Sequence, residues 1–167
     1  MNDSLNICLS CGLCCDGTLI GHVQLNREEI PALRKIMDIE DESGNGFFLH
    51  PCSKYCDGCT IYSQRPKQCA SFNCGLLTSY EQKELGFDSA IEIIDRTRQK
   101  KIAIGKKIVA LNITLKSQSF YFKMVELKKV LQKIKSESSF TQKHIELTAD
   151  LKELDGLLTN SFGISSY

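Results

Sequence analysis

Hydrophobic residues near the C-terminus recur every three or four positions, which is the spacing of one face of a helix. A first stripe consists of Met124, Leu127, Leu131 and Ile134. A second and longer stripe consists of Phe140, His144, Leu147, Leu151, Leu154 and Leu158. A short polar connection, 135–139, separates the two stripes. The pattern therefore predicts an antiparallel helical hairpin at the end of the chain.

Upstream of this hairpin the pattern is less uniform. Phe87, Ile91 and Ile94 share one helical face, which predicts a helix over 87–101. Residues 102–124 fit a helical and an alternating pattern equally well, and their β-branched content favours a β-hairpin there.

The first half of the chain contains shorter patterned segments. Residues 19–25 alternate between apolar and polar positions, which predicts a strand, and 27–37 has the spacing of a helix that buries Ile30, Leu33 and Met37. Residues 38–46 read as an acidic loop, and 47–50 as a short extended segment that leads to the next cysteines. The sequence thus predicts only a minor β component.

Charge and cysteine content divide the chain into two halves. Residues 1–80 hold six Lys and Arg against nine Asp and Glu, and all nine cysteines lie between Cys8 and Cys74. We therefore expect a cysteine-cluster region over 1–78 and a helical region over 79–167 that packs on it as one domain. The chain shows no signal-peptide pattern and no apolar run of membrane-spanning length, so we expect a cytoplasmic protein that does not bind a membrane.

The cysteines form two tight groups, which mere core packing would not produce. The first group is Cys8, Cys11, Cys14 and Cys15, with two residues between the first three. The second group is Cys52, Cys56, Cys59, Cys69 and Cys74. A C-x2-C-x2-C run is the spacing with which ferredoxins hold a cluster, whereas a single C-x2-C also serves zinc. Thiolates suit both metals, so the residues leave iron–sulfur and zinc open.

These groups carry a resemblance to a known family. The run Gly12 to Cys15 and the later segments resemble the YkgJ-type CxxCxxCC cysteine-cluster family, described as zinc- or iron-chelating and often labelled as containing an iron–sulfur cluster. The matching later positions are Pro51-Cys52, Cys59, Ile61-Tyr62, Arg65-Pro66, Cys69, Phe72 and Cys74. The resemblance spans 8–74, and it differs at Ala70 and Asn73, neither of which supplies a ligand. It implies a distant link to flagellin lysine N-methylases, which carry a related cysteine domain.

Eight of the nine cysteines occupy family positions, and Cys56 is the extra one. The resemblance therefore implies a metal-ligand set of Cys8, Cys11, Cys14, Cys15, Cys52, Cys59, Cys69 and Cys74. The favoured cofactor is an iron–sulfur cluster of the 4Fe–4S type, and zinc is the alternative.

Several other polar residues are candidates for smaller roles. Arg65 can donate hydrogen bonds to thiolates or nearby carbonyl groups, and His50 lies two positions before Cys52, where it can ligate a metal or hydrogen-bond a sulfur. His144 lies on the last apolar stripe and reads as a core or interface residue, whereas His22 reads as exposed.

A run of basic residues follows the cysteines. It comprises Arg96, Arg98, Lys100, Lys101, Lys106 and Lys107, with more lysines at 123–135. We interpret it as a solvated helical surface rather than a nucleic-acid site, because interleaved stacking aromatics are sparse.

We therefore expect an α-rich α+β protein, in which an irregular cysteine-ligated metal core with minor β structure precedes helices that include a C-terminal αα-hairpin. The expected function is that of an iron–sulfur protein in electron transfer, or of the metal-bearing component of a modification enzyme, with an unidentified protein or redox partner. The alternative is a structural zinc module whose basic helical half binds a protein or nucleic acid. A third reading is an enzyme that uses Cys15 or Cys56 as a nucleophile, so the residues leave enzymatic activity open.

Overall fold

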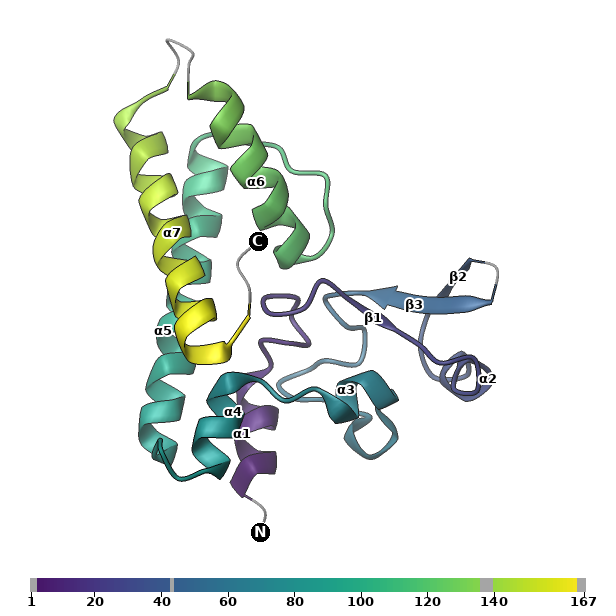
Figure 1. Cartoon of the computed structure of the whole chain (residues 1–167). Helices are drawn as coiled ribbons and strands as arrows, with labels where there is room; N and C mark the ends of the chain where they lie inside the picture. The colour runs from purple at the N-terminus through teal and green to yellow at the C-terminus, as the bar shows by residue number, and fades with distance from the viewer. Residues whose placement is uncertain (1–2, 43, 136–139, 165–167) are drawn as a thin grey trace. The chain divides into compact units, whose positions relative to one another are not determined.

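The computed structural model describes residues 3–42, 44–135 and 140–164 (Figure 1). The chain divides into two units. One comprises Met1–Asn73 and Gln118–Tyr121, and we call it the cysteine unit because it holds every cysteine except Cys74. The other comprises Cys74–Ser117 and Phe122–Tyr167, and we call it the helical unit. The predicted α-rich α+β class is confirmed.

A three-stranded antiparallel sheet forms the regular part of the cysteine unit (Figure 1). Its order is β1(His22–Gln24), β3(Asn45–Leu49), β2(Glu40–Glu42). Val23 pairs with Phe48 across β1 and β3, and both side chains are buried. They form a core with Leu25 and with three apolar residues that follow in the chain, Ile30, Leu33 and Met37.

The sequence predicts those three residues, Ile30, Leu33 and Met37, as the buried face of a helix over 27–37, and all three are indeed buried. The helix itself is much shorter, because only α2(Ile30–Leu33) is helical. Proline lacks the N–H that would bond to the carbonyl group four residues earlier, so Pro31 leaves the preceding turn outside the helix.

The predicted acidic loop over 38–46 is also partly wrong, because it contains the edge strand β2. Asp41 pairs with Gly46 of β3 in an antiparallel register. Charged residues are common on edge strands, where they discourage pairing with another chain, so their presence did not exclude a strand.

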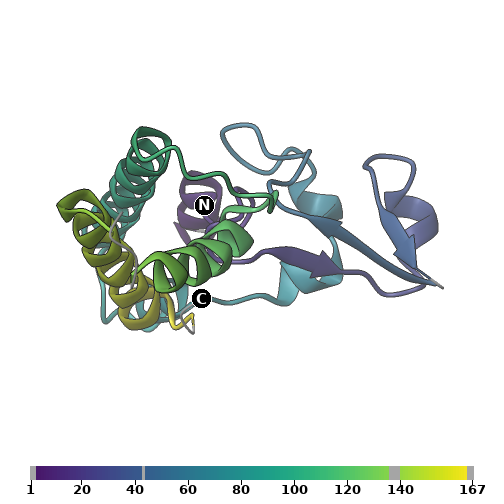
Figure 2. The ribbon, with the colours of Figure 1, turned by 90° about the horizontal axis from the view of Figure 1, so that it is seen from above.

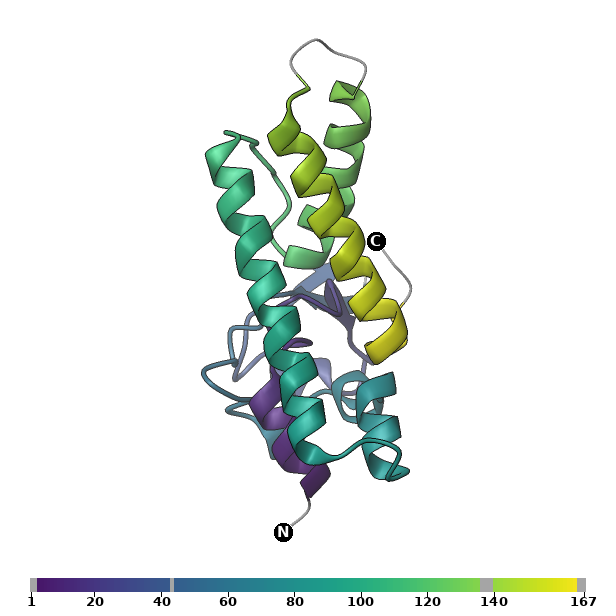
Figure 3. The same cartoon turned by 90° about the vertical axis from the view of Figure 1, so that its left-hand side faces the viewer.

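The described part of the helical unit contains α4(Gly75–Glu81), α5(Phe87–Ala110), all but the first two residues of α6(Phe120–Ile134), and α7(Gln142–Phe162). The β-hairpin that the sequence favours within 102–124 is wrong, since α5 continues to Ala110 and α6 begins at Phe120. The reason is tertiary packing: Ile94, Thr97 and Ile104 continue one buried stripe of α5, and α5 packs extensively along α7 (Figure 3). No helix in the described part of the chain is long and apolar enough to cross a membrane.

The predicted pair of C-terminal helices is confirmed, although the residues that connect them, 136–139, lie outside the described residues. α6 and α7 run in opposite directions (Figure 3). Lys128 of α6 pairs with Asp155 of α7 at 2.7 Å. His144 is not the core residue that its stripe suggests. It is half-buried, caps α7 together with Thr141 and stacks on Phe140.

Part of the predicted basic surface forms an ion-paired seam between α5 and α7. Lys100 lies 3.0 Å from Asp150 and 2.7 Å from Glu153, and Lys107 also pairs with Asp150. Arg96 pairs with Glu153 at 3.3 Å. These cations therefore join two helices of the same unit instead of forming an unpaired positive face.

Candidate metal centre

The first two cysteines of the motif lie on a helix. Cys8 and Cys11 are on α1(Asp3–Cys11), three residues apart, and Gly12 ends that helix. The Gly12 N–H donates to the carbonyl oxygen of Cys8 at 3.3 Å, and its φ of +59° is in the left-handed region that favours glycine at a helix C-terminus. Cys14 and Cys15 follow in tight turns, so this glycine sets the direction in which the chain presents them.

Contacts to its backbone carbonyl group hold Cys15 next to the segment that carries Cys52. The N–H of Cys52 donates to the carbonyl oxygen of Cys15 at 2.8 Å, and Nδ1 of His50 lies 3.1 Å from the same oxygen. His50 is 2% exposed, and its Nε2 has no hydrogen-bond partner among the described residues. His50 therefore holds the Cys15 turn in place through a backbone carbonyl. Neither this contact nor the pairing of Cys15 with Cys52 could be foreseen from the spacing.

The loop after Cys52 folds back on itself and brings Cys59 close to Cys52. The Thr60 N–H donates to the carbonyl oxygen of Lys54 at 2.9 Å, and Tyr55 pairs with Cys59 as an isolated antiparallel bridge. The Lys54 N–H donates to Sγ of Cys52 at 3.5 Å. Cys56, at the tip of this loop, is exposed. This placement agrees with its position outside the family motif.

Cys69 lies on the short helix α3(Lys67–Ser71), which the cysteine unit fixes at two points. The Lys67 N–H donates to Oε1 of Glu29, and Oε1 of Gln68 accepts from the N–H of Gln24 in β1, both at 2.6 Å. These contacts fix α3 against the sheet and against the turn before α2.

Arg65 contacts a carbonyl group, as one of its two predicted roles requires. It lies just after the 3-10 helix η1(Tyr62–Gln64), where its guanidinium donates to the carbonyl oxygen of Tyr62 at 2.9 Å and lies 3.7 Å from the centre of the Tyr62 ring.

Four thiols of the cysteine unit influence one another electrostatically: Cys15, Cys52, Cys59 and Cys69, which we call the four-thiol group. Burial and, to a smaller degree, the nearby Cys59, Cys52 and Cys69 together raise the pKa of Cys15 to about 12. Burial, Cys52 and Cys59 likewise raise the pKa of Cys69 to about 12, and Arg65 opposes this increase. The pKa of Cys52 is also raised, chiefly by burial and to a smaller degree by Cys59, whereas the hydrogen bond from the Lys54 N–H lowers it.

The other predicted ligands lie outside this group. Cys8 lies near Tyr62, whose pKa is raised chiefly by burial and to a smaller degree by Cys8. Cys11 is buried, and Cys14 is half-buried. Cys74 belongs to the helical unit and precedes α4; burial raises its pKa, and the backbone amides of the first turn of α4 oppose this.

The structure thus brings four of the eight predicted ligands into mutual electrostatic range. As placed, no three His, Cys, Asp or Glu side chains within 3–42, 44–135 and 140–164 form a group that could hold one metal ion. The ligand set derived from the sequence therefore stays a prediction. The donor chemistry fits a soft metal centre, because the group consists of half-buried thiols and the Lys54 N–H donates to one of their sulfur atoms.

Comparison with known proteins agrees with this chemistry. No curated protein and no solved structure matches the chain. One family model matches residues 7–91, which is half of the chain and contains all nine cysteines. The chain therefore belongs to the CxxCxxCC family, whose description reads "putative zinc- or iron-chelating domain".

Proposed function

We propose that the cysteine unit binds an iron–sulfur cluster through the four-thiol group, and that the protein acts in electron transfer or as the metal-bearing component of a modification enzyme. The observation that carries this proposal is that four half-buried thiols drawn from distant positions in the chain, 15, 52, 59 and 69, lie within electrostatic range of one another. Such a group gathers negative charge in a desolvated place as soon as its thiols ionise.

Without a bound metal, Cys15, Cys52 and Cys69 favour the protonated thiol, because their pKa values are raised. Each thiolate that forms raises the cost of forming the next one, because like charges close together disfavour ionisation. A cationic metal centre reverses this cost, since it binds thiolates and displaces their protons. The same residues that are unfavourable as four bare thiolates are therefore suited to a cationic metal centre.

Sulfur donors restrict the choice of metal to soft or borderline ions, among which zinc and iron–sulfur are the relevant ones. Two features support a redox cluster: the Lys54 N–H that donates to Sγ of Cys52, and the cationic Arg65 near Cys69. Hydrogen bonds and charge near cluster sulfurs tune the reduction potential of iron–sulfur centres. Cys8, Cys11, Cys14 and Cys74 stay candidate ligands.

Anaerobic purification, followed by a visible spectrum and by analysis of iron, zinc and acid-labile sulfide, tests the proposal. We expect a brown protein that bleaches with dithionite and holds about four iron and four sulfide ions for each 4Fe–4S cluster. Colourless protein with bound zinc would overturn the iron–sulfur assignment and make the site a structural scaffold.

Single substitutions then test which thiols bind. Cys15→Ser and Cys59→Ser should lower the metal content, whereas Cys56→Ser is the matched control because this cysteine is exposed and lies outside the four-thiol group. Far-UV circular dichroism of each variant reports whether the helices are retained. Full metal content in folded Cys15→Ser protein would show that the four-thiol group is not the site.

A further inference from the structure

The first turn of α6 is hydrogen-bonded to the turn that carries Cys15. The N–H of Tyr121, the second residue of α6, donates to the carbonyl oxygen of Gly17 at 2.7 Å. The first N–H groups of a helix have no partner within that helix, so they need an acceptor from elsewhere. Here the acceptor is a backbone carbonyl group from a distant part of the chain. Gly17 and 118–121 both belong to the cysteine unit, so this contact lies within one unit.

The Gly17 carbonyl group is itself held in a compact turn. The Gly17 N–H donates to the carbonyl oxygen of Cys14 at 3.1 Å, and the Thr18 N–H donates to that of Leu13 at 3.0 Å. These bonds close the segment into one structure, which we call the 13–18 turn. A shift of either cysteine within this turn therefore also moves the acceptor for α6.

The start of α6 packs closely on this turn. A Cβ atom built on Gly17, whose φ is +81°, would lie 3.0 Å from Cβ of His50 and 3.4 Å from the backbone nitrogen of Phe120. It would also lie 3.4 Å from Cβ of Ser119, a residue that is completely buried. His50 is the residue whose Nδ1 contacts the carbonyl oxygen of Cys15. Gly17 therefore fills a narrow space between the residue that holds Cys15 and the start of α6.

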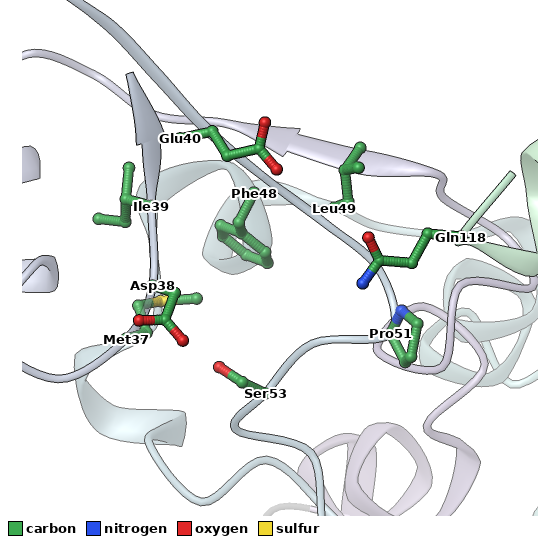
Figure 4. A pocket seen from close by; sticks show the side chains of 9 residues that line it. All are labelled: Met37, Asp38, Ile39, Glu40, Phe48, Leu49, Pro51, Ser53 and Gln118. Carbon is green, nitrogen blue, oxygen red and sulfur yellow. The ribbon is translucent and has the colours of Figure 1, made fainter.

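The residue before this contact lies beside the second cysteine group. Gln118 lines a hollow of about 220 Å³ together with Pro51 and Ser53, which flank Cys52 (Figure 4). From Gln118 the chain continues directly into α6 (Figure 2). The segment 118–121 is thus adjacent to two of the backbone segments that carry the four-thiol group.

We propose that the hydrogen bond between Gly17 and Tyr121 couples metal binding to the order of α6. Once Cys15 holds a metal, the 13–18 turn is restrained and keeps the first turn of α6 in place. This inference rests on the proposed function only in that Cys15 is a ligand, and zinc would serve as well as an iron–sulfur cluster. In metal-free protein the turn has more conformational freedom, so the start of α6 loses its acceptor for part of the time. Because coupling between two sites is reciprocal, an ordered start of α6 also favours metal binding.

Hydrogen exchange of the full chain, measured by mass spectrometry, tests the coupling. The parent protein is compared before and after a chelator removes its metal, and metal content is determined on both samples. We expect the amides of 122–126 to exchange about two- to tenfold faster after metal removal, which is the effect of losing one backbone hydrogen bond. The amides of 147–158 in α7 are the internal reference and should be unchanged. Unchanged exchange at 122–126 after metal loss would overturn the proposal, and so would an equal acceleration in α7.

Two substitutions of one residue separate the hydrogen bond from the side chain. Tyr121→Pro removes the N–H donor, and proline is tolerated in the first turn of a helix. Tyr121→Ala is the matched control, because it removes the same side chain and keeps the N–H. Exchange at 122–126 should depend on metal in Tyr121→Ala, whereas in Tyr121→Pro it should be fast with and without metal. The same metal dependence in both variants would refute the coupling.

Thiol reactivity in metal-free protein gives a test that does not depend on the proposed function. At pH 8, iodoacetamide should modify Cys15 about two- to tenfold faster in Tyr121→Pro than in Tyr121→Ala, because the 13–18 turn opens more often without its bond to α6. Cys69 on α3 should react at the same rate in both variants, which shows that the cysteine unit stays folded. Equal rates for Cys15 would refute the coupling. Unequal rates in a chain that binds no metal would refute only the proposed function.

Discussion

Replacing Gly12 by alanine tests the close approach that directs the chain from α1 into the cysteine turns. Gly12 has a φ of +59°, and a Cβ atom built on it would lie 2.5 Å from both Cε2 and Cζ of Tyr55. Real Cβ atoms essentially never approach another heavy atom so closely, so either the ring or the turn has to move. Because Tyr55 pairs with Cys59, the substitution should also disturb the loop that carries part of the four-thiol group.

Two separate costs set the size of the effect. A non-glycine residue in the left-handed region costs about 1–2 kcal/mol. Forcing an extra methyl group into a packed site costs about 1–3 kcal/mol, and the lower part of that range applies if the Tyr55 ring can shift. We therefore expect Gly12→Ala to lower the free energy of unfolding of the cysteine unit by about 2–4 kcal/mol.

A second glycine supplies the matched control. Gly105 lies inside α5, and a Cβ atom added there meets nothing within 4 Å. Since alanine is the better helix former, Gly105→Ala should stabilise the protein by about 0.5–1 kcal/mol.

Hydrogen exchange measured by mass spectrometry is the suitable assay, because it reports on the two units separately where a single melting curve would combine them. Metal content is determined on the same samples. Faster exchange is expected in peptides from 3–73 of Gly12→Ala and not in those of Gly105→Ala. If Gly12→Ala exchanges like the parent and keeps its metal, the contact between Gly12 and Tyr55 does not constrain this region.

Two further predictions concern charge and thiol chemistry. Burial raises the pKa of Asp150, but hydrogen bonds from the two lysines of α5 outweigh it, so the pKa lies below its ordinary value of 3.8. Asp150→Asn should therefore lower the free energy of unfolding by about 1 kcal/mol at pH 7, measured by urea unfolding. As the pH falls below 3.8 and through the lowered pKa of folded Asp150, this difference should disappear, because the parent protein then loses the same negative charge. In metal-free protein at pH 8, iodoacetamide should modify the exposed Cys56 at least about tenfold faster than Cys15 or Cys69. The reason is that pKa values of about 12 keep the thiols of Cys15 and Cys69 protonated. Peptide mass spectrometry measures the rates, and equal rates would contradict the burial of those two thiols.

The sequence predicts elements well where one periodicity dominates. The stripe from Leu147 to Leu158 is apolar on one face only, and it forms α7 as expected. Between 102 and 115 both periods are present, so the pattern alone does not choose between them. The choice depends on α7, which packs along α5 from a distant part of the chain, and no local pattern contains that information.

For the candidate site, the sequence indicates which residues carry the chemistry but not which of them lie close together. Cys14 and Cys15 are adjacent members of the same motif, and the motif does not indicate that Cys15 lies within electrostatic range of Cys52, Cys59 and Cys69. The cause is a backbone contact, the Cys52 N–H on the carbonyl oxygen of Cys15, which no side-chain pattern can encode.

The ion pairs of the helical unit bear on which part of the protein interacts with a partner. A nucleic-acid site gains affinity when its lysines and arginines bind phosphates and release counterions. Lys100, Lys107 and Arg96 are instead engaged with Asp150 and Glu153, so a phosphate would have to compete with carboxylates that are already in place. This competition weakens the reading in which the basic half binds nucleic acid, and the seam is better explained as a link between α5 and α7. The chemistry that distinguishes this chain is then concentrated in the cysteine unit, which contains the four-thiol group.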